Sequence, residues 1–189
     1  MMIHTLSQPY TKDRGFTGIR TFIGALSILA LVLLDASSSA DPPALPHGWR
    51  IPSSAETNDD WRNQDSNRYL VVKADFNGDG IPDQARLLIH DGNSQVALFA
   101  FVSQKDRSFK TYSLDEKNAA YLKVLGITKV PPGRYTTACG KGYAECRGGE
   151  QPEVVLGHHA IDYFKVEGPH SYFYWDSTAI VFKVVGISD

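Results

Sequence analysis

A series of short apolar segments separated by turn-forming residues limits what this chain can fold into. The segments are rich in branched and aromatic residues, and several alternate apolar with polar side chains, which is typical of β-strands. Asp91-Gly92-Asn93 separates two of them and predicts a hairpin turn. The segments read RYLVVKADF, QARLLIH, QVALFAFVS, SFKTYSL, PEVVLGH, AIDYFKVE, SYFYWD and AIVFKVVGI. The sequence therefore predicts a mainly β fold, either a small antiparallel sandwich or an incomplete barrel.

One or two short helices are expected beside the strands. The segment SAETNDDWRNQDS begins at a possible cap, Ser54, and Trp61 is its expected apolar anchor. The segment DEKNAAYLKVL is the second candidate. In SYFYWD, Tyr172 and Tyr174 are expected on one face of a strand, and Phe173 and Trp175 on the other.

The first forty residues are expected to be a secretory signal peptide. A basic region with Lys12, Arg14 and Arg20 precedes an apolar run from Phe22 to Leu34, and small residues follow up to Ala40. A membrane anchor is the alternative, but a spanning helix needs about 20 apolar residues. No cysteine precedes Cys139, so a lipid anchor on a new terminal cysteine is not expected.

The protein is therefore predicted to be periplasmic or secreted, without stable insertion in the membrane after cleavage. Residues 41–54 carry four prolines and are expected to form an extended lead-in, followed by a single β domain over 55–189. Of 19 basic and 21 acidic residues, three basic and two acidic ones lie in the leader, which leaves a net charge of −3. This balance offers no basic stripe for nucleic acid.

An acidic loop between two predicted strands is the most specific motif in the sequence. The segment DFNGDGIPDQ places oxygen ligands at the first, third and fifth positions and glycine at the sixth, as in an EF-hand loop. The twelfth position is Arg86 instead of glutamate, and strands are expected on both sides. Such closely spaced carboxylates repel each other unless a cation lies among them, and hard oxygen ligands favour Ca²⁺. The expected ligands are Asp75, Asn77, Asp79, the Ile81 carbonyl and Asp83.

The motif D-x-N-x-D-G-x-x-D resembles the calcium loops of FG-GAP and VCBS-type repeats, which lie between β-strands. The resemblance implies a calcium site on a β scaffold. Propellers built from such repeats need several blades, and this chain has one copy of the motif, so a lone module is expected. A polar hairpin turn without a metal is the alternative for this loop.

The two cysteines, Cys139 and Cys146, are predicted to form a disulfide because the chain is expected to be exported. A metal site shared with His158 and His159 is the alternative, but the C-x6-C spacing is not that of a zinc site.

The cysteines lie in a long irregular segment, residues 130–152, which contains five glycines and three prolines. Long irregular loops in a compact domain are usually functional or disordered, and a cross-link favours a fixed surface that contacts a protein. A covalent staple under a surface loop is the alternative. The expected partner-binding residues are Arg134, Lys141 and Tyr143, with Tyr135 and Arg147 beside them.

Within this segment, Cys139-Gly140-Lys141-Gly142-Tyr143 is similar to the Ser-Gly-x-x-Tyr loop of periplasmic lysozyme inhibitors. Certain bacterial immunity proteins against lysozyme-like effectors also look similar and bind calcium on a β scaffold. The glycine and the tyrosine match, whereas Cys139 replaces the serine. The resemblance implies a lysozyme-like or other cell-wall hydrolase as the partner.

The sequence contains no G-x-S-x-G, no H-E-x-x-H and no glycine-rich phosphate loop. The pair His158-His159 with Asp162 is the alternative, as an acid–base or metal cluster of a secreted hydrolase. Adjacent histidines in a strand point to opposite faces, so only one of them serves a given site. We therefore expect a binding protein and not an enzyme.

Overall fold

The computed structural model describes residues 42–63, 65 and 67–188, and in this part of the chain it contains eleven strands and two 3-10 helices. The strands pair antiparallel, so the prediction of a mainly antiparallel β fold is confirmed. The predicted signal peptide and its cleavage point lie outside the described residues. None of the helices among the described residues is long and apolar enough to cross a membrane.

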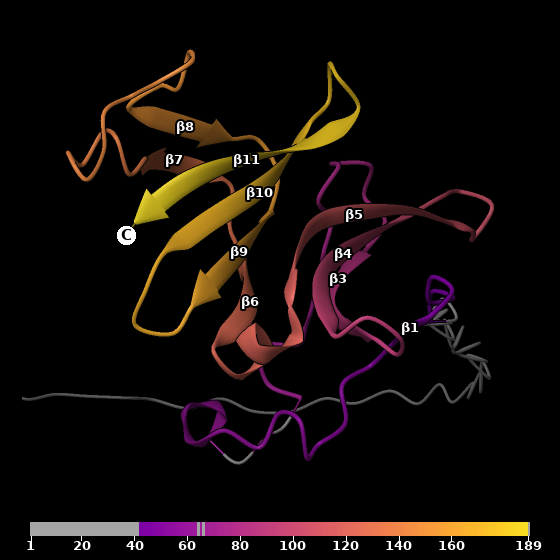
Figure 1. The fold of residues 1–189 in the computed structure, drawn as a ribbon. Coiled ribbons are helices and arrows are strands. Elements are labelled where there is room, and N and C mark those ends of the chain that lie inside the picture. Colours follow the sequence, from indigo (N-terminus) through magenta and orange to yellow (C-terminus); the bar gives the residue numbers. More distant parts are fainter. Residues whose placement is uncertain (1–41, 64, 66, 189) are drawn as a thin grey trace, which may run out of the picture. The chain divides into compact units, whose positions relative to one another are not determined.

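Two larger sheets and a two-stranded ribbon make up the domain (Figure 1). The first sheet has the order β1 (Trp49–Arg50), β3 (Asp83–His90), β4 (Gln95–Ser103) and β5 (Phe109–Asn118), with β2 (Val71–Ala74) also paired to β3. The second has the order β11 (Val181–Ser188), β10 (His170–Asp176), β9 (Ala160–Lys165) and β6 (Leu125–Val130). The ribbon consists of β7 (Gly133–Thr136) and β8 (Glu153–Leu156).

The main core lies between the two larger sheets. It contains alternate residues of β3 and β4, such as Leu87 and Leu98, and residues of the second sheet such as Ile127 and Phe173. The opposite face of the second sheet packs on the ribbon, where Tyr172 and Tyr174 contact a smaller cluster around Leu156. Tyr172 and Tyr174 thus lie on the face opposite Phe173, which confirms the alternation expected for SYFYWD.

The strands β3 and β4 are buried on both faces, which explains their nearly continuous apolar sequences. Their outer face, with Leu88, Phe99 and Phe101, is covered in part by Leu45 and Trp49. The proline-rich lead-in therefore packs on the sheet, and part of it forms β1.

Both predicted helices are shorter than expected and have 3-10 geometry. They span Asp60–Arg62 and Ala119–Lys123. Trp61 stacks on Tyr69 and donates to the Lys123 carbonyl at 2.8 Å, while the fully buried residue of the first helix is Arg62. Its guanidinium donates to the carbonyls of Arg68, Leu122 and Leu125 at 2.8 to 2.9 Å. A buried cation thus anchors the segment that we expected an apolar side chain to hold.

Candidate functional site

The acidic loop, residues 75–83, connects β2 to β3, and its side chains turn inward onto its own backbone. The two Asp75 oxygens accept hydrogen bonds from the amides of Gly78 at 2.6 Å and Gly80 at 2.8 Å. Asn77 Oδ1 accepts from the Asp79 amide at 3.1 Å, and Asp79 Oδ1 from the Ile81 amide at 2.8 Å. These bonds fix a tight loop, and each ionised carboxylate oxygen keeps a lone pair for a further partner.

Asp83 differs from the other acidic residues because its side chain is fully buried. Its oxygens accept hydrogen bonds from the amides of Phe76 at 2.9 Å and Ser103 at 2.8 Å, which ties the loop to β4. The pKa of the Asp83 carboxyl is raised to about 6, mainly by burial; the charges of Asp79 and Asp75 act in the same direction, and the two amide hydrogen bonds act against it. Asp83 therefore stabilises the loop through its own hydrogen bonds to the backbone.

The carboxylates of this loop have no ion-pair partner among the described residues. Within residues 42–63, 65 and 67–188, none of Asp75, Asp79 and Asp83 forms an ion pair with a lysine or arginine. In the same residues, no three His, Cys, Asp or Glu side chains converge as a ready-made metal cluster. The donor set of carboxylate, amide and carbonyl oxygens is of the kind that Ca²⁺ takes. The proposed ligands, Asp75, Asn77, Asp79, Ile81 and Asp83, thus fit calcium in chemistry and remain a prediction.

His158 lies against the acidic loop although it is far away in the sequence. It belongs to the bend between β8 and β9, and a Cβ atom built on Gly78 would lie 2.0 Å from its Cε1 atom. Gly78 also has a φ of +80°, a conformation that favours glycine. The positive φ of Gly78 could be expected from the motif, whereas nothing in the neighbouring sequence indicated the contact with His158.

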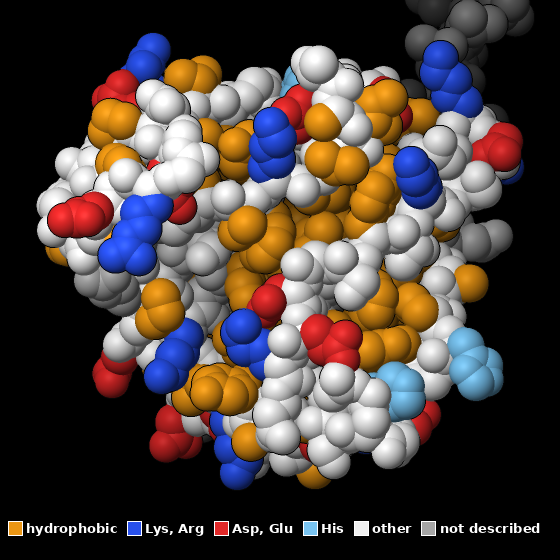
Figure 2. All heavy atoms as spheres, turned by 45° about the horizontal axis from the view of Figure 1, so that its top comes forward, with side chains coloured by type: hydrophobic (Ala, Val, Ile, Leu, Met, Phe, Trp, Pro, Cys, Tyr) orange, Lys and Arg blue, Asp and Glu red, His pale blue; other side chains and the backbone are white. Residues whose placement is uncertain are grey.

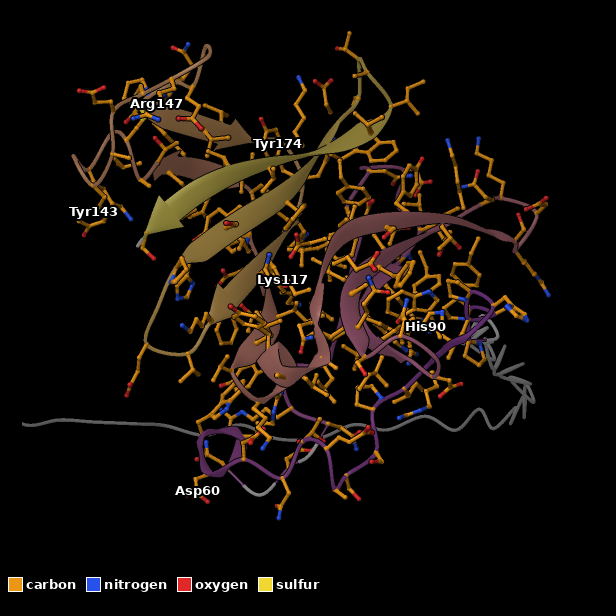
Figure 3. All side chains as sticks on the ribbon, in the orientation of Figure 1. Asp60, His90, Lys117, Tyr143, Arg147 and Tyr174 are labelled. Carbon is orange, nitrogen blue, oxygen red and sulfur yellow. A yellow bond between two sulfur atoms is a disulfide. The ribbon has the colours of Figure 1, made fainter. Side chains whose placement is uncertain are left out.

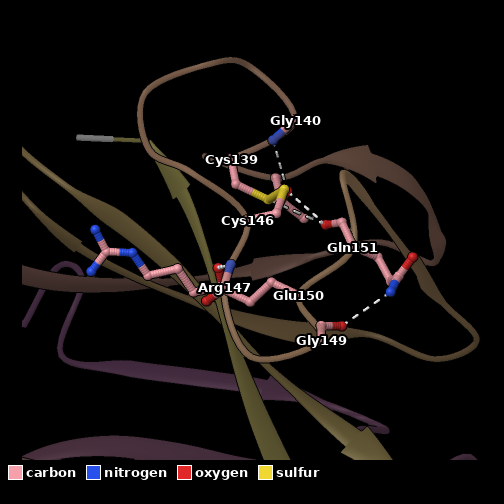
Figure 4. Close-up of a disulfide and its surroundings, with 8 residues drawn as sticks. Cys139, Gly140, Cys146, Arg147, Gly149, Glu150 and Gln151 are labelled. Carbon is pink, nitrogen blue, oxygen red and sulfur yellow. Dashed lines mark hydrogen bonds between the residues drawn. A yellow bond between two sulfur atoms is a disulfide. The ribbon is translucent and has the colours of Figure 1, made fainter.

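The disulfide loop, residues 137–152, joins the two strands of the ribbon. Cys139 and Cys146 are bonded to each other, as predicted, with their Cα atoms 5.0 Å apart (Figure 4). The buried Thr137 closes the base of the loop: its amide donates to the Pro152 carbonyl and its hydroxyl to the Gln151 carbonyl. The Ala138 amide donates to the Gly186 carbonyl of β11, so the loop is also attached to the second sheet.

Three of the five residues expected at a partner surface have side chains that bond to other residues of the domain. Lys141 Nζ donates to the Ile187 carbonyl at 2.9 Å, and Arg134 pairs with Glu153 at 2.9 Å. The Tyr135 hydroxyl donates to the Pro131 carbonyl. Lys141 therefore holds the loop in place instead of extending from it.

The other two, Tyr143 and Arg147, are exposed. Tyr143 is 54% exposed, and Arg147 extends away from the disulfide in Figure 4. Figure 3 places both in the same loop at one end of the domain. Among the described residues, neither side chain has a hydrogen-bond or salt-bridge partner. The cross-linked loop thus carries one exposed aromatic side chain and one exposed basic side chain.

The structure does not join His158 or His159 to Asp162 through a hydrogen bond within its described residues. The Asp162 carboxylate pairs with His170 Nδ1 at 3.0 Å and accepts from the Thr128 hydroxyl at 3.3 Å. The pKa of the Asp162 carboxyl is raised overall because of burial, and the interactions with His170 and Thr128 act in the opposite direction. The Asp162–His170 pair connects β9 and β10 and was not foreseen from the sequence, in which the two residues are eight positions apart.

Comparisons of this chain with protein-family models, curated proteins and solved structures gave no match.

Proposed function

We propose that the domain is an exported calcium-binding module that acts by binding another protein through the disulfide loop. The proposed partner is a lysozyme-like or other cell-wall hydrolase. The observation that carries this proposal is the combination of a cross-linked, anchored loop with an exposed tyrosine and arginine at its surface. A preorganised loop loses little conformational entropy on binding, and tyrosine and arginine are enriched among residues that dominate binding energies.

Calcium has a structural role in this proposal. The ion would be held by Asp75, Asn77, Asp79 and Asp83 with the Ile81 carbonyl, and it would offset the negative charge of the acidic loop. Because His158 packs on Gly78, a fixed acidic loop also supports the bend between β8 and β9. β8 is one of the two strands that carry the disulfide loop.

The direct test is inhibition of purified cell-wall hydrolases. Release of soluble fragments from purified peptidoglycan is measured for a panel of lysozymes and amidases, with and without the mature protein. We expect inhibition of at least one enzyme and a saturable 1:1 complex with it. Replacement of Tyr143 and Arg147 together by alanine should weaken the complex at least tenfold without lowering the melting temperature.

Tyr121→Ala is the matched control because Tyr121 is an exposed tyrosine on another element, 46% exposed in the helix Ala119–Lys123. It should leave inhibition unchanged. Lys141→Ala is unsuitable for this purpose because Lys141 anchors the loop. The absence of inhibition and binding across the panel would contradict the proposed partner. Fragment release by the pure protein alone would instead favour the hydrolase around His158 or His159.

A further inference from the structure

A cavity of about 470 Å³ lies between the two larger sheets, where the main core opens to solvent. Figure 2 shows apolar side chains gathered in a hollow of the surface, with charged side chains next to it. The volume falls within the range of small-ligand sites. The cavity is lined mainly by apolar residues of β5, β6, β9, β10 and β11 and of the helix between β5 and β6, among them Leu114, Tyr121, Leu125, Tyr163, Phe173 and Val184.

A β-bulge in β5 turns two charged side chains toward this cavity. Phe99 pairs with Ser113, but the preceding residue Leu98 pairs with Asp115, so Leu114 is the extra residue. Side chains alternate along a strand, and the shift by one residue places Asp115 and Lys117 on the side of the main core. Without the bulge, Glu116 would take that side. Bulges often occur next to functional sites, where they redirect side chains.

Asp115 and Lys117 form the polar wall of the cavity. Lys117 Nζ lies 3.0 Å from Asp115 Oδ2, an oxygen that is buried and has no aligned hydrogen bond among the described residues. The hydroxyl of Tyr163 lies beside the same carboxylate, and burial, together with that charge, raises the pKa of Tyr163. Figure 3 shows Lys117 between β5 and the strands β9 and β10.

Among the described charged residues that line the cavity, there is one more lysine than there are acidic residues. Asp115 is matched by Lys117, and Lys165 also lines the cavity without an ion-pair partner in the described part of the chain. We propose that this cavity binds a single-chain amphiphile with a carboxylate head. Its apolar chain packs between Leu114, Phe173 and Val184, and its head accepts hydrogen bonds from the ammonium groups of Lys165 and Lys117. This site is separate from the disulfide loop, so the result of a ligand-binding test is independent of the function proposed above.

The test is calorimetric titration of the mature protein with decanoate below its micelle concentration, and with decyltrimethylammonium as the probe of opposite charge. We expect saturable 1:1 binding of decanoate and weaker binding of the cation. Lys165→Glu should weaken decanoate binding at least tenfold and strengthen that of decyltrimethylammonium. Lys105→Glu makes the same charge change at a lysine that does not line the cavity, and it should leave both affinities within twofold.

A second variant tests the apolar part of the site. Val184 is 58% exposed on β11, so Val184→Trp is expected to fold and to fill the cavity from its rim. It should reduce the affinity for decanoate and for decyltrimethylammonium alike, whereas Lys165→Glu should change the two affinities in opposite directions. Absence of saturable decanoate binding to the folded protein would overturn the proposal. Equal effects of Lys165→Glu and Lys105→Glu would also overturn it.

Discussion

Gly78 has two separate reasons to be glycine, and the acidic loop offers a matched residue that has only one of them. Gly78 and Gly80 have φ values of +80° and +83°. A side chain on Gly78 would collide with the His158 ring, whereas on Gly80 the same position has no heavy atom of another described residue within 4 Å, apart from the adjacent residues of the chain. The two glycines therefore separate the cost of backbone strain from the cost of a collision.

We expect Gly80→Ala to lower the free energy of unfolding by about 1 kcal/mol, which is the strain of alanine at positive φ. Gly78→Ala should cost roughly 1 to 3 kcal/mol more, because the new methyl group must displace His158. Combining Gly78→Ala with His158→Ala should bring the loss back toward that of Gly80→Ala. Urea unfolding of the variants measures this. Equal losses for the two single glycine variants would show that His158 does not restrict Gly78.

The Arg62 guanidinium is held mainly by hydrogen bonds to backbone carbonyls, and its one acidic partner is more distant. Its guanidinium is fully buried, and its contact with Asp59 is long, at 3.4 Å. Burial lowers the pKa of this guanidinium. The three carbonyls that it contacts belong to Arg68, Leu122 and Leu125.

We expect Arg62→Met to lower the free energy of unfolding by at least about 3 kcal/mol, because two buried carbonyls and one partly buried carbonyl lose their donor. Arg68→Met is the control: Arg68 is exposed and lies over the Tyr69 ring, and its loss should cost less than about 1 kcal/mol. Urea unfolding at neutral pH compares the two. A similar small loss for both would contradict an anchoring role of Arg62.

At the scale of elements, Arg50 joins the lead-in to the first sheet and is sensitive to acid through its partner. It donates to Glu56 at 2.8 and 2.9 Å and to Asp91 in the β3–β4 turn at 2.7 Å. The hydrogen bonds from Arg50, and then those from Ser53, lower the pKa of Glu56 to about 2. A carboxyl with a lowered pKa stabilises the fold above its unfolded pKa and loses this contribution as the pH falls through its folded pKa.

We therefore expect the contribution of Glu56 to be complete above about pH 4.5 and to disappear as the pH falls toward 2. The pair is partly exposed, so the contribution should be less than about 1 kcal/mol. Glu56→Gln should reduce stability at neutral pH and make little difference at pH 2, as measured by urea unfolding across this range. Glu116→Gln, at an exposed position of β5 with no ion-pair partner among the described residues, is the control. A constant difference between Glu56→Gln and the natural protein would contradict the prediction.

Sequence patterns predicted the long strands well because their signals are local. The segments QARLLIH and QVALFAFVS match β3 and β4 closely. The end of β5 was missed, because Asp115 to Asn118 have helix-compatible composition and are held in the sheet by pairing with β4. The bulge at Leu114 was missed for the same reason: it depends on the register between two strands, which no single segment determines.

At the scale of the whole molecule, the candidate site was only partly predictable. The disulfide and the acidic loop lie within short segments, so spacing alone pointed to them. The contact of His158 with Gly78 and the attachment of Lys141 to Ile187 join distant parts of the chain and depend on how the sheets pack. The partner surface expected around Arg134, Lys141 and Tyr143 stays a prediction, and the bond from Lys141 to the Ile187 carbonyl could not be foreseen from the local sequence.

Calcium should stabilise the entire domain if it binds the acidic loop, because that loop connects β2 to β3 and Asp83 also ties it to β4. Without a bidentate glutamate at the twelfth position, we expect a dissociation constant on the order of micromolar to millimolar. Calcium at a hundred times this constant should raise the free energy of unfolding by about 2.7 kcal/mol.

Asp79→Ala is the informative variant, because Asp79 is exposed and its loss removes a proposed ligand without opening the core. Asp83→Asn is less suitable, since Asp83 also accepts buried amide bonds that hold the loop. We expect Asp79→Ala to remove most of the stabilisation by calcium and to change stability little in chelator, because it also relieves carboxylate repulsion. Asp60→Ala, at an exposed position of the first 3-10 helix, should keep the full response. Calorimetric melting with calcium and with chelator measures both variants, and an unchanged melting temperature of the natural protein, with no heat of calcium binding, would mean that the loop is a polar turn without a metal.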